Sequence, residues 1–375
     1  MAGNYGMRLA VFHLLNDLSG SPKVLSQVVR GVAPACDSID LHTSGRGDSG
    51  ALDDCMDIPN VRFHRVAYSF AGHGLKTIWR FAVANAKGFM SGFKYLFSPK
   101  TVFYINTILP VGAALSGRLT GHRVIYHYHE NARTKGRPYR TLARVMQWLA
   151  SDIICVSEYQ RNFLARDHRV TVVPNALPQE FVDRLLPDAD AAFARRTVLM
   201  TGSLNEYKGL SEYVALAHRM PQLKFVMVVN GTYEHIENFR RNHGLDFPSN
   251  LTVYPRQNDM ASFYNSASVV LNLTDKTQAV ESFGLSVLEA LTAGLPVIVP
   301  TVGGVATLVE DGINGWHIDA SDLDGIVARL TSLFGDTDST RSGGDYRRLS
   351  ANALTIAARY SEKTQTEAIL NLLTD

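Results

Sequence analysis

A short segment near residue 290 constrains the fold most, because a helix pattern there leads directly into a buried strand pattern. Leucines recur at helical spacing across residues 285–293, which predicts a short amphipathic helix. Gly294 follows where a helix end favours a left-handed residue, and Pro296 prevents the helix from continuing. The apolar run at residues 296–300 is bounded by prolines and is typical of a buried parallel strand. The segment therefore predicts one helix-to-strand unit of a parallel α/β sheet.

The same alternation of strand-like runs and helix patterns extends through the chain. A chain of 375 residues is too long for one typical core and suits two domains. Alternating strands and helices predict a doubly wound parallel sheet in each half. The predicted strands are residues 9–14, 102–106, 124–129, 153–156 and 170–173 in the first half, and 198–201, 225–229, 251–254, 269–273 and 297–299 in the second.

Two carboxylates separated by seven residues flank the start of the predicted helix. Glu281 lies in the loop before the helix, and Glu289 lies about one turn along it. The unpaired amides at the helix start, with Gly284 allowing close backbone approach, predict a phosphate cradle. A carboxylate beside an anion site is expected to accept hydrogen bonds from hydroxyl groups, which sugars supply.

This spacing resembles the E-x7-E signature of retaining glycosyltransferases of the GT-B fold, most closely family 4 (glycosyl transferases group 1). Further motifs of that family occur in the same order along the chain, and the resemblance covers residues 150–318 well. The first 120 residues match the family only in outline. The motifs are V-P-N-A at residues 173–176, G-S-L with K-G at 202–204 and 208–209, V-N-G at 229–231, and G-G with E-D-G at 303–304 and 310–312.

The resemblance implies an α/β protein of the GT-B fold, with two Rossmann-like, doubly wound parallel-sheet domains facing across a cleft. Residues 1–178 would bind the acceptor, residues 179–355 would bind the nucleotide sugar, and a C-terminal helix at 356–375 would return to the first domain. Independently, a domain boundary is expected between residues 176 and 196, where prolines interrupt an acidic stretch.

The resemblance also implies roles for individual residues. Glu281 would contact hydroxyls of the transferred sugar, and Glu289 would contact the nucleotide ribose. Lys208 would bind the diphosphate, and His129, at the end of a predicted strand, would meet the donor sugar; Glu281, His129 and Lys208 are the predicted catalytic residues. Other donor-binding residues are expected to be Gly20, Ser203, Arg256, Ser282, Phe283, Gly284 and Leu285.

Ser203 departs from the family pattern, which usually has an arginine at this position. A serine donates a hydrogen bond but carries no charge, so stabilisation of the leaving diphosphate falls on Lys208 and backbone amides. Another cation could contribute, and Arg256 is a candidate. The serine at position 203 also leaves open the alternative that the chain binds nucleotide sugar without catalysing transfer.

Each of these residues has a structural alternative. A carboxylate near a helix start often complements the helix dipole, a lysine before a glycine is usually at the surface, and His129 can be a satisfied structural histidine. His127, His129 and Glu130 imitate a metal site but lack a well-spaced further ligand. Asp-x-Asp triplets at 188–190, 322–324 and 336–338 are interpreted as acidic loops. The expectation is therefore no metal and no bound cofactor, with the nucleotide-diphosphate sugar as co-substrate.

The net charge of +2 conceals a polarised chain. No Asp or Glu occurs between Ile58 and His129, a stretch that holds nine Lys or Arg residues. Residues 1–151 hold 18 cations and 8 acids, or +10, and the remainder holds 19 and 27, or −8. A basic half indicates an anionic partner, either a membrane or a phosphorylated acceptor; no recognition motif supports nucleic acid.

Residues 73–100 interleave aromatic and aliphatic residues with Lys76, Arg80, Lys87 and Lys94. This composition is typical of a helix lying in an anionic membrane interface, although the apolar residues could equally face the domain core. Gly88 and Gly92 weaken the helix prediction. Three cysteines without metal or redox spacing indicate a reduced, cytoplasmic protein. Together with the basic segment, this leads to the expectation of a protein that is peripheral on the inner face of the cell membrane.

The prediction from the sequence is a retaining, metal-independent glycosyltransferase. It would move a sugar from a nucleotide-diphosphate sugar to a glycan or lipid-linked acceptor in the synthesis of cell-surface polysaccharide or glycolipid. The alternatives are a nucleotide-sugar epimerase or hydrolase of the same fold, and a non-catalytic nucleotide-sugar-binding subunit. The donor, the acceptor and the linkage leave no mark in the sequence.

Overall fold

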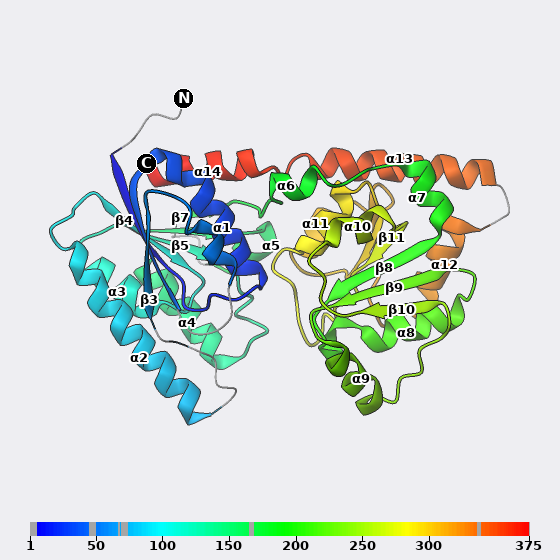
Figure 1. The fold of residues 1–375 in the computed structure, drawn as a ribbon, viewed down its shortest axis with the longest axis horizontal. Coiled ribbons are helices and arrows are strands. Elements are labelled where there is room, and N and C mark those ends of the chain that lie inside the picture. Colours follow the sequence, from blue (N-terminus) through cyan, green and yellow to red (C-terminus); the bar gives the residue numbers. More distant parts are fainter. Residues whose placement is uncertain are drawn as a thin grey trace. The chain divides into compact units, whose positions relative to one another are not determined.

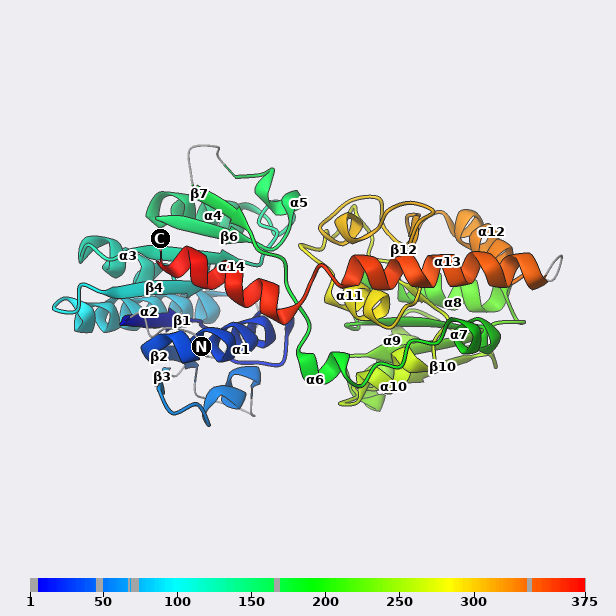
Figure 2. The ribbon, with the colours of Figure 1, turned by 90° about the horizontal axis from the view of Figure 1, so that it is seen from above.

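The computed structural model of the chain describes residues 6–44, 50–66, 68, 74–164, 169–335 and 339–374. The chain divides into two compact units, Met1–Ala176 with Glu362–Asp375, and Leu177–Ser361. Each unit is a parallel β-sheet covered by helices (Figures 1 and 2). The predicted fold class of two parallel-sheet α/β domains is therefore confirmed.

In the first unit, seven strands form one sheet in the order β3-β2-β1-β4-β5-β6-β7. The chain begins in the middle of the sheet, builds outward to β3, and then adds β4 on the other side of β1. Strand order thus reverses between β1 and β4, which pair from Arg8 opposite Thr101 to Phe12 opposite Ile105. The strands are β1 (Met7–Phe12), β2 (Cys36–Ser44), β3 (Val61–Val66), β4 (Thr101–Asn106), β5 (Val124–Tyr128), β6 (Asp152–Cys155) and β7 (Arg169–Val172).

Helices cover both faces of this sheet. Figure 1 shows α1 and α14 on one side and α2, α3 and α4 on the other, and α14 packs against α1. Alanines of α3 and α4 pack on buried strand residues such as Phe103 and Tyr126. The helices are α1 (Gly20–Val32), α2 (Leu75–Gly92), α3 (Val111–Leu119), α4 (Arg137–Leu149), α5 (Glu158–Arg161) and α14 (Glu362–Thr374).

One of the two glycines that weaken the helix prediction, Gly92 at the end of α2, has a packing role, as does Gly112 on the neighbouring α3. A Cβ atom on Gly92 would lie 1.8 Å from Oγ of Ser116, and one on Gly112 would lie 2.0 Å from the carbonyl oxygen of Asn85. The absent side chains let α2 and α3 approach more closely than larger residues permit. Tertiary packing therefore outweighs the low helix propensity of glycine in this segment.

In the second unit, six strands form a sheet in the order β10-β9-β8-β11-β12-β13, and strand order reverses between β8 and β11. The strands are β8 (Thr197–Gly202), β9 (Lys224–Val229), β10 (Leu251–Tyr254), β11 (Val269–Leu271), β12 (Val297–Val299) and β13 (Gly315–His317). The helices are α6 (Gln179–Val182), α7 (Ala189–Arg195), α8 (Leu210–Arg219), α9 (Tyr233–Asn242), α10 (Met260–Asn265), α11 (Leu285–Thr292), α12 (Leu323–Phe334) and α13 (Ser339–Ala357).

The structure differs from the sequence-based elements at three strands and at the C-terminus. The predicted strands omit β2 and β3, where polar residues alternate with apolar ones, and β13, which is only three residues long. The helical pattern expected near the C-terminus forms two helices, α13 and α14, and the second belongs to the first unit. The boundary between the second unit and this last helix falls between Ser361 and Glu362. The expectation from the sequence places it after residue 355.

None of the helices formed by the described residues is long and apolar enough to cross a membrane.

We expect one buried hydroxyl to contribute measurably to the second sheet. Tyr213 on α8 is fully buried, and its hydroxyl lies 2.8 Å from the carbonyl oxygens of both Val198 and Val226. Tyr213→Phe should lower the free energy of unfolding by about 1 kcal/mol, because a buried hydrogen bond is lost. The matched control is Tyr233→Phe, whose side chain is 69% exposed. Urea denaturation checks the prediction, and equal midpoints for both variants would contradict it.

Candidate functional site

The strand reversal of the second unit brings two loops together at the carboxyl ends of β8 and β11. The loop after β8 contains a short 3₁₀ turn that ends at Lys208. Gly209 follows with φ of 79°, and a Cβ atom there would lie 2.5 Å from the carbonyl oxygen of Leu273 in the other loop. Only glycine fits both this left-handed conformation and this close approach. The K-G motif therefore places the lysine beside the segment that follows β11.

Glu281 lies at the centre of a polar cluster formed by these loops. Its Oε1 accepts hydrogen bonds from Lys208 Nζ at 2.5 Å, Thr274 Oγ1 at 2.8 Å and Asn272 Nδ2 at 3.1 Å. Lys208 Nζ also lies 3.4 Å from Thr274 Oγ1. The side chains of Lys208 and Glu281 are only 21% and 20% exposed. Two predicted catalytic residues are thus paired with each other.

The electrostatics of this cluster keep Glu281 ionised. Burial alone would raise the pKa of Glu281, but the charge of Lys208 and the hydrogen bonds that the carboxylate accepts outweigh it and hold the pKa below its usual value. A carboxylate has room for about four hydrogen bonds, and all three donors converge on Oε1. The other oxygen, Oε2, is therefore the part of the carboxylate suited to accept further hydroxyl donors.

The start of α11 is built by glycines from two loops. Gly284 precedes the helix with φ of 104°. A Cβ atom on Gly304 would lie 1.8 Å from the carbonyl oxygen of Ser282, and the Gly304 amide donates to the carbonyl of Glu281 at 2.8 Å. Phe283 turns inward, with its side chain 4% exposed. Within the predicted donor-binding residues 282–285, Phe283 can therefore contact a ligand only through its backbone. Leu285 is the first residue of α11.

Glu289 lies on α11 and is held by a buried tyrosine. The hydroxyl of Tyr264 donates to Glu289 Oε2 at 2.5 Å. Burial, and then the negative charge of Glu289, raise the pKa of Tyr264 well above its usual value, so the phenol remains a donor. This hydrogen bond orients the carboxylate of Glu289. The predicted ribose ligand is thereby fixed in one position.

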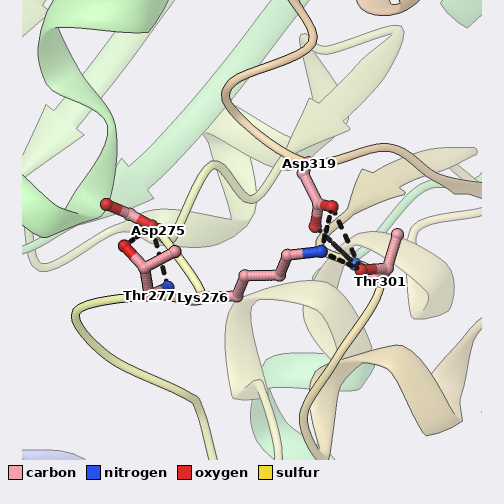
Figure 3. A network of polar contacts seen from close by, with 5 residues as sticks. All are labelled: Asp275, Lys276, Thr277, Thr301 and Asp319. Carbon is pink, nitrogen blue, oxygen red and sulfur yellow. Dashed lines mark hydrogen bonds and ion pairs between the residues drawn. The ribbon is translucent and has the colours of Figure 1, made fainter.

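A second ion pair anchors the loop between β11 and α11 from its other side (Figure 3). Lys276 Nζ contacts Asp319 Oδ2 at 2.5 Å and Thr301 Oγ1 at 2.9 Å, and the Thr301 amide donates to Asp319 Oδ1 at 3.0 Å. Burial raises the pKa of Asp319, but these hydrogen bonds outweigh it and lower the pKa below its usual value. Loops after β11, β12 and β13 are thus tied together beside the candidate site.

The remaining predicted donor-binding residues of the second unit lie on neighbouring loops. Ser203 follows β8, and its Oγ accepts a hydrogen bond from Asn205 Nδ2 at 2.7 Å. Arg256 follows β10 and has an exposed side chain. The Arg256 amide donates to the carbonyl of Gly231 at 2.9 Å, which joins it to the V-N-G motif after β9.

In the first unit, Gly20 and His129 line one cavity of about 320 Å³. Gly20 begins α1 after β1, and His129 follows β5, so both lie at the carboxyl edge of the sheet near its strand reversal. The Nε2 atom of His129 lies 2.9 Å from Asn106 Oδ1. Burial, and then the neighbouring His127 and His13, lower the pKa of His129 well below its usual value. Its imidazole is therefore neutral at physiological pH.

The combination of His127, His129 and Glu130 does not gather into a metal site. His127 Nδ1 instead bonds the hydroxyl of Tyr104 at 2.8 Å. Across the part of the chain that the structure describes, no three His, Cys, Asp or Glu side chains lie close enough to hold a metal ion. Of the Asp-x-Asp triplets, the one at 336–338 lies outside the described residues.

Several members of the site carry no signal that sequence reasoning recognised. Asn272 and Thr274 form an N-x-T triplet without an evident role, and Tyr264 lies within an ordinary helix pattern. All three bond a predicted carboxylate. In the first unit, Glu130 and Lys135 line the cavity beside His129. Only the position of Thr274 at the end of a strand run, next to the reversal point, could have indicated its role.

Solved structures agree with this architecture. The structure of HepE from Anabaena in complex with UDP and glucose matches 98% of this chain and 100% of that chain with a TM-score of 0.76, at 17% sequence identity. Two parallel-sheet units with loops gathered at their strand reversals define the GT-B class. The chain has the fold of GT-B glycosyltransferases.

The sequence of the second unit matches a known family model. Residues 189–353 match the family described as Glycosyl transferases group 1, which confirms the predicted resemblance on that segment. An uncharacterized glycosyltransferase of Haemophilus influenzae is 27% identical over 237 residues, 61% of this chain and 64% of that protein. A sucrose synthase of Acidithiobacillus caldus is 34% identical over 94 residues, 24% of this chain and 12% of that protein. The chain thus spans less than two thirds of the length of these relatives.

We expect the Lys208–Glu281 pair to stabilise the second unit in a pH-dependent way. Lys208→Met leaves a largely buried carboxylate without its cation, so the free energy of unfolding at pH 7 should fall by about 1–3 kcal/mol. The folded state lowers the pKa of Glu281, so the pair stabilises above the unfolded pKa of about 4.3 and loses this contribution as the pH falls through the lower folded value.

Chemical denaturation at pH 7 and pH 3 measures this difference. The gap between wild type and Lys208→Met should shrink at the lower pH. Lys224→Met is the matched control, because Lys224 is exposed and forms no ion pair with the described residues. A gap that is independent of pH would show that the lysine contributes through packing and not through the charge of Glu281.

Proposed function

We propose that this chain is a retaining, metal-independent glycosyltransferase of family 4 that acts at the cytoplasmic face of the membrane. Its second unit binds a nucleotide-diphosphate sugar, and its first unit binds a glycan or lipid-linked acceptor. The setting is the synthesis of cell-surface polysaccharide or glycolipid. The single observation that carries the proposal is the Glu281 cluster, a buried carboxylate paired with Lys208 beside a glycine-built helix start.

The chemistry of this cluster suits a diphosphate and a sugar side by side. The amides at the start of α11 and the ammonium of Lys208 favour the two phosphates, and Oε2 of Glu281 accepts sugar hydroxyls. Glu289, held by Tyr264, is suited to accept hydrogen bonds from the ribose hydroxyls. HepE, which has the same fold, binds UDP and glucose, and this supports a nucleotide-sugar donor here.

The proposed reaction replaces the bond from the sugar to the diphosphate by a bond to the acceptor on the same face. The acceptor oxygen bonds the anomeric carbon, the bond from that carbon to the diphosphate oxygen breaks, and the acceptor proton passes to the departing phosphate. Lys208 stabilises the charge that grows on the leaving group, and Glu281 orients the sugar. The protein supplies orientation and charge, so EDTA should leave the rate unchanged.

We expect substitutions of Glu281 and Glu289 to change different kinetic constants. Glu281→Gln loses charged hydrogen bonds to the reacting sugar, each contributing about 1.5–3 kcal/mol, so kcat should fall by roughly ten- to 150-fold. Glu289→Gln should mainly raise the KM of the nucleotide sugar. Glu180→Gln, an exposed position on α6, is the control. Steady-state kinetics with the donor selected by a thermal-shift panel of nucleotide sugars tests this, and unchanged kcat in Glu281→Gln refutes the assignment.

The membrane part of the proposal rests on α2 and the turn that follows it. Apolar side chains that sequence reasoning left undecided between core and surface prove to be mostly exposed. Trp79 is 70% exposed and Phe97 is 92% exposed, while Tyr95 is buried. Lys76, Lys87 and Lys94 are exposed. The exposed apolar members of this surface, here called the α2 ridge, are Leu75, Ile78, Trp79, Met90, Phe93, Leu96 and Phe97.

An exposed apolar stripe flanked by lysines suits the surface of an anionic bilayer. Residues 75, 79, 90, 93 and 97 repeat at intervals close to the helical period, so they share one face of α2 and its extension. Aromatic and aliphatic side chains enter the headgroup region, while lysines meet anionic headgroups. A lipid-linked acceptor would then be presented at the surface to which the first unit is bound.

We expect this surface to bind vesicles of anionic phosphatidylglycerol and not vesicles of neutral phosphatidylcholine. Each lysine near the surface contributes about 1 kcal/mol, so replacing Lys76, Lys87 and Lys94 by glutamine should weaken binding by roughly 100-fold. Trp79→Ser with Phe97→Ser should remove the portion of binding that survives high salt. Trp148→Ser, which replaces a 73% exposed tryptophan on α4, is the control. Co-sedimentation measures each, and equal pelleting by all variants would exclude the α2 ridge.

One observation favours a second candidate function. Ser203 supplies no charge where the family usually has an arginine, which is consistent with a chain that binds nucleotide sugar without transferring it. Ser203→Arg distinguishes the two, because it should be tolerated or activating in an enzyme. A chain that binds donor tightly but shows no turnover with either residue is the non-catalytic subunit.

A further inference from the structure

The loop between β11 and α11 is held at a second point, outside the Glu281 cluster, by Lys276. Figure 3 shows the lysine side chain extending from this loop to Asp319 and Thr301. Its Nζ atom donates to Asp319 Oδ2 at 2.5 Å and to Thr301 Oγ1 at 2.9 Å. The side chains of Lys276 and Asp319 are 38% and 20% exposed, so solvent screens this ion pair only in part. The pair joins two positions that lie 43 residues apart in the sequence.

A tight turn fixes the position of Lys276. Asp275 Oδ1 accepts hydrogen bonds from the Thr277 amide at 2.8 Å and from the Thr277 hydroxyl at 2.7 Å, so the lysine lies between two residues that bond each other. The Asp275 amide donates to the carbonyl of Tyr207 at 2.7 Å, which anchors the start of the loop next to Lys208. A turn closed by side-chain bonds to the backbone restricts the directions that the lysine side chain can take.

Asp319 holds the loop after β12 as well as the lysine. Its Oδ1 accepts a hydrogen bond from the Thr301 amide at 3.0 Å, and its two oxygens lie 3.0 and 3.1 Å from the Thr301 hydroxyl. Thr301 follows β12, Asp319 follows β13, and β11, β12 and β13 are neighbours in the sheet. The side chains of Lys276, Thr301 and Asp319 are here called the Lys276 cluster. This cluster therefore joins the loops that follow three neighbouring strands.

The loop after β12 supports the backbone of Glu281. The Gly304 amide donates to the carbonyl of Glu281 at 2.8 Å. A Cβ atom on Gly303 would lie 3.0 Å from the same carbonyl oxygen, and one on Gly304 would lie 1.8 Å from the carbonyl oxygen of Ser282. Both glycines closely follow Thr301 in the chain. A shift of Thr301 would therefore move the surface on which the backbone of Glu281 rests.

We propose that the Lys276 cluster positions Glu281 for sugar transfer. The proposal rests on the proposed function, because it concerns the rate of that reaction. The donors of the Glu281 cluster fix the carboxylate oxygen Oε1, whereas the Lys276 cluster fixes the backbone of the same residue through the loop after β12. Its three members are positioning residues, and none of them forms or breaks a bond. A misplacement of about 1 Å in a group that orients substrate can lower a rate by roughly 100-fold, so an ion pair outside the site can control the rate.

Steady-state kinetics of the full chain test the proposal, with the donor that the thermal-shift panel selects. Lys276→Met removes the positive charge, and Asp319→Asn removes the negative charge but keeps an acceptor oxygen for Thr301. Each should lower kcat by roughly tenfold or more and leave the KM of the nucleotide sugar nearly unchanged. The double variant should lose little more than either single variant, because both substitutions break the same ion pair.

The matched control is the ion pair between Arg219 on α8 and Asp324 at the start of α12. Arg219→Met and Asp324→Asn make the same chemical changes in the same unit, and kcat should stay at the wild-type value. If Arg219→Met lowers kcat as much as Lys276→Met does, the loss reflects a general effect on the second unit and the proposal is overturned.

Coupling to Glu281 separates positioning from a purely structural role. Glu281→Ala removes the carboxylate that is positioned, so the addition of Lys276→Met should lower kcat little further. Losses that multiply in the double variant would mean that Lys276 acts independently of Glu281, and they overturn the proposal.

Hydrogen exchange provides a readout that does not depend on turnover. The Gly304 amide, which donates to Glu281, should exchange faster in Lys276→Met and Asp319→Asn than in the wild type, and at the wild-type rate in Arg219→Met. Mass spectrometry of a peptide that contains Gly304 measures this exchange. Equal exchange in all four proteins, or an unchanged kcat in Lys276→Met, overturns the proposal and leaves the proposed function standing. If the wild-type chain transfers sugar from no nucleotide sugar, the proposed function itself fails, and the role in transfer fails with it.

Discussion

The reversal of strand order in each sheet is the constraint on which both candidate sites depend. In a parallel sheet all carboxyl ends lie at one edge, and loops on the two sides of a reversal diverge to opposite faces and leave space between them. The first unit reverses between β1 and β4, where the cavity with His129 and Glu130 lies. The second unit reverses between β8 and β11, where Lys208 meets Glu281. In each unit, the candidate site residues therefore lie at the carboxyl ends of the strands, next to the reversal of strand order.

The second site is organised around the need to neutralise one buried carboxylate. Three donors converge on a single oxygen of Glu281, and the most strongly charged of them, Lys208, is also the residue expected to bind a diphosphate. A diphosphate can therefore attract Lys208 only in competition with Glu281, whose remaining donors, Asn272 and Thr274, are neutral. Such a pair keeps both groups ionised and in place before a ligand arrives, which is a form of preorganisation.

Sequence reasoning recovered the features that repeat locally and missed those that depend on distant contacts. The helix at 285–293 and the strand at 297–299 were predictable, because periodicity, Gly294 and Pro296 all act within a few residues. The spaced motifs that led to the predicted donor site lie mostly within residues 189–353, the segment that matches the family model, and the site itself stays a prediction. Thr274 and Tyr264 could not be found this way, since their importance comes from bonds to residues seven and 25 positions away. Likewise β2 and β3 escaped notice because polar residues interrupt their apolar runs, although only β3 lies at the edge of the sheet.

The expectation of an anionic partner rests on which cations form ion pairs within the protein, and not only on the net charge. In the second unit, cations such as Lys208, Lys276, Arg219 and Arg347 are each paired with a carboxylate of the same unit. Lys87 on α2 and Lys135 in the loop before α4 are exposed and form no such pair within the described residues. Positive charge in the second unit is therefore largely used for internal structure. The first unit also pairs cations such as Arg65 and Arg123 internally, but the lysines of α2 remain available at its surface. A surface with unpaired cations beside exposed aromatic residues suits the extended negative charge of an anionic bilayer.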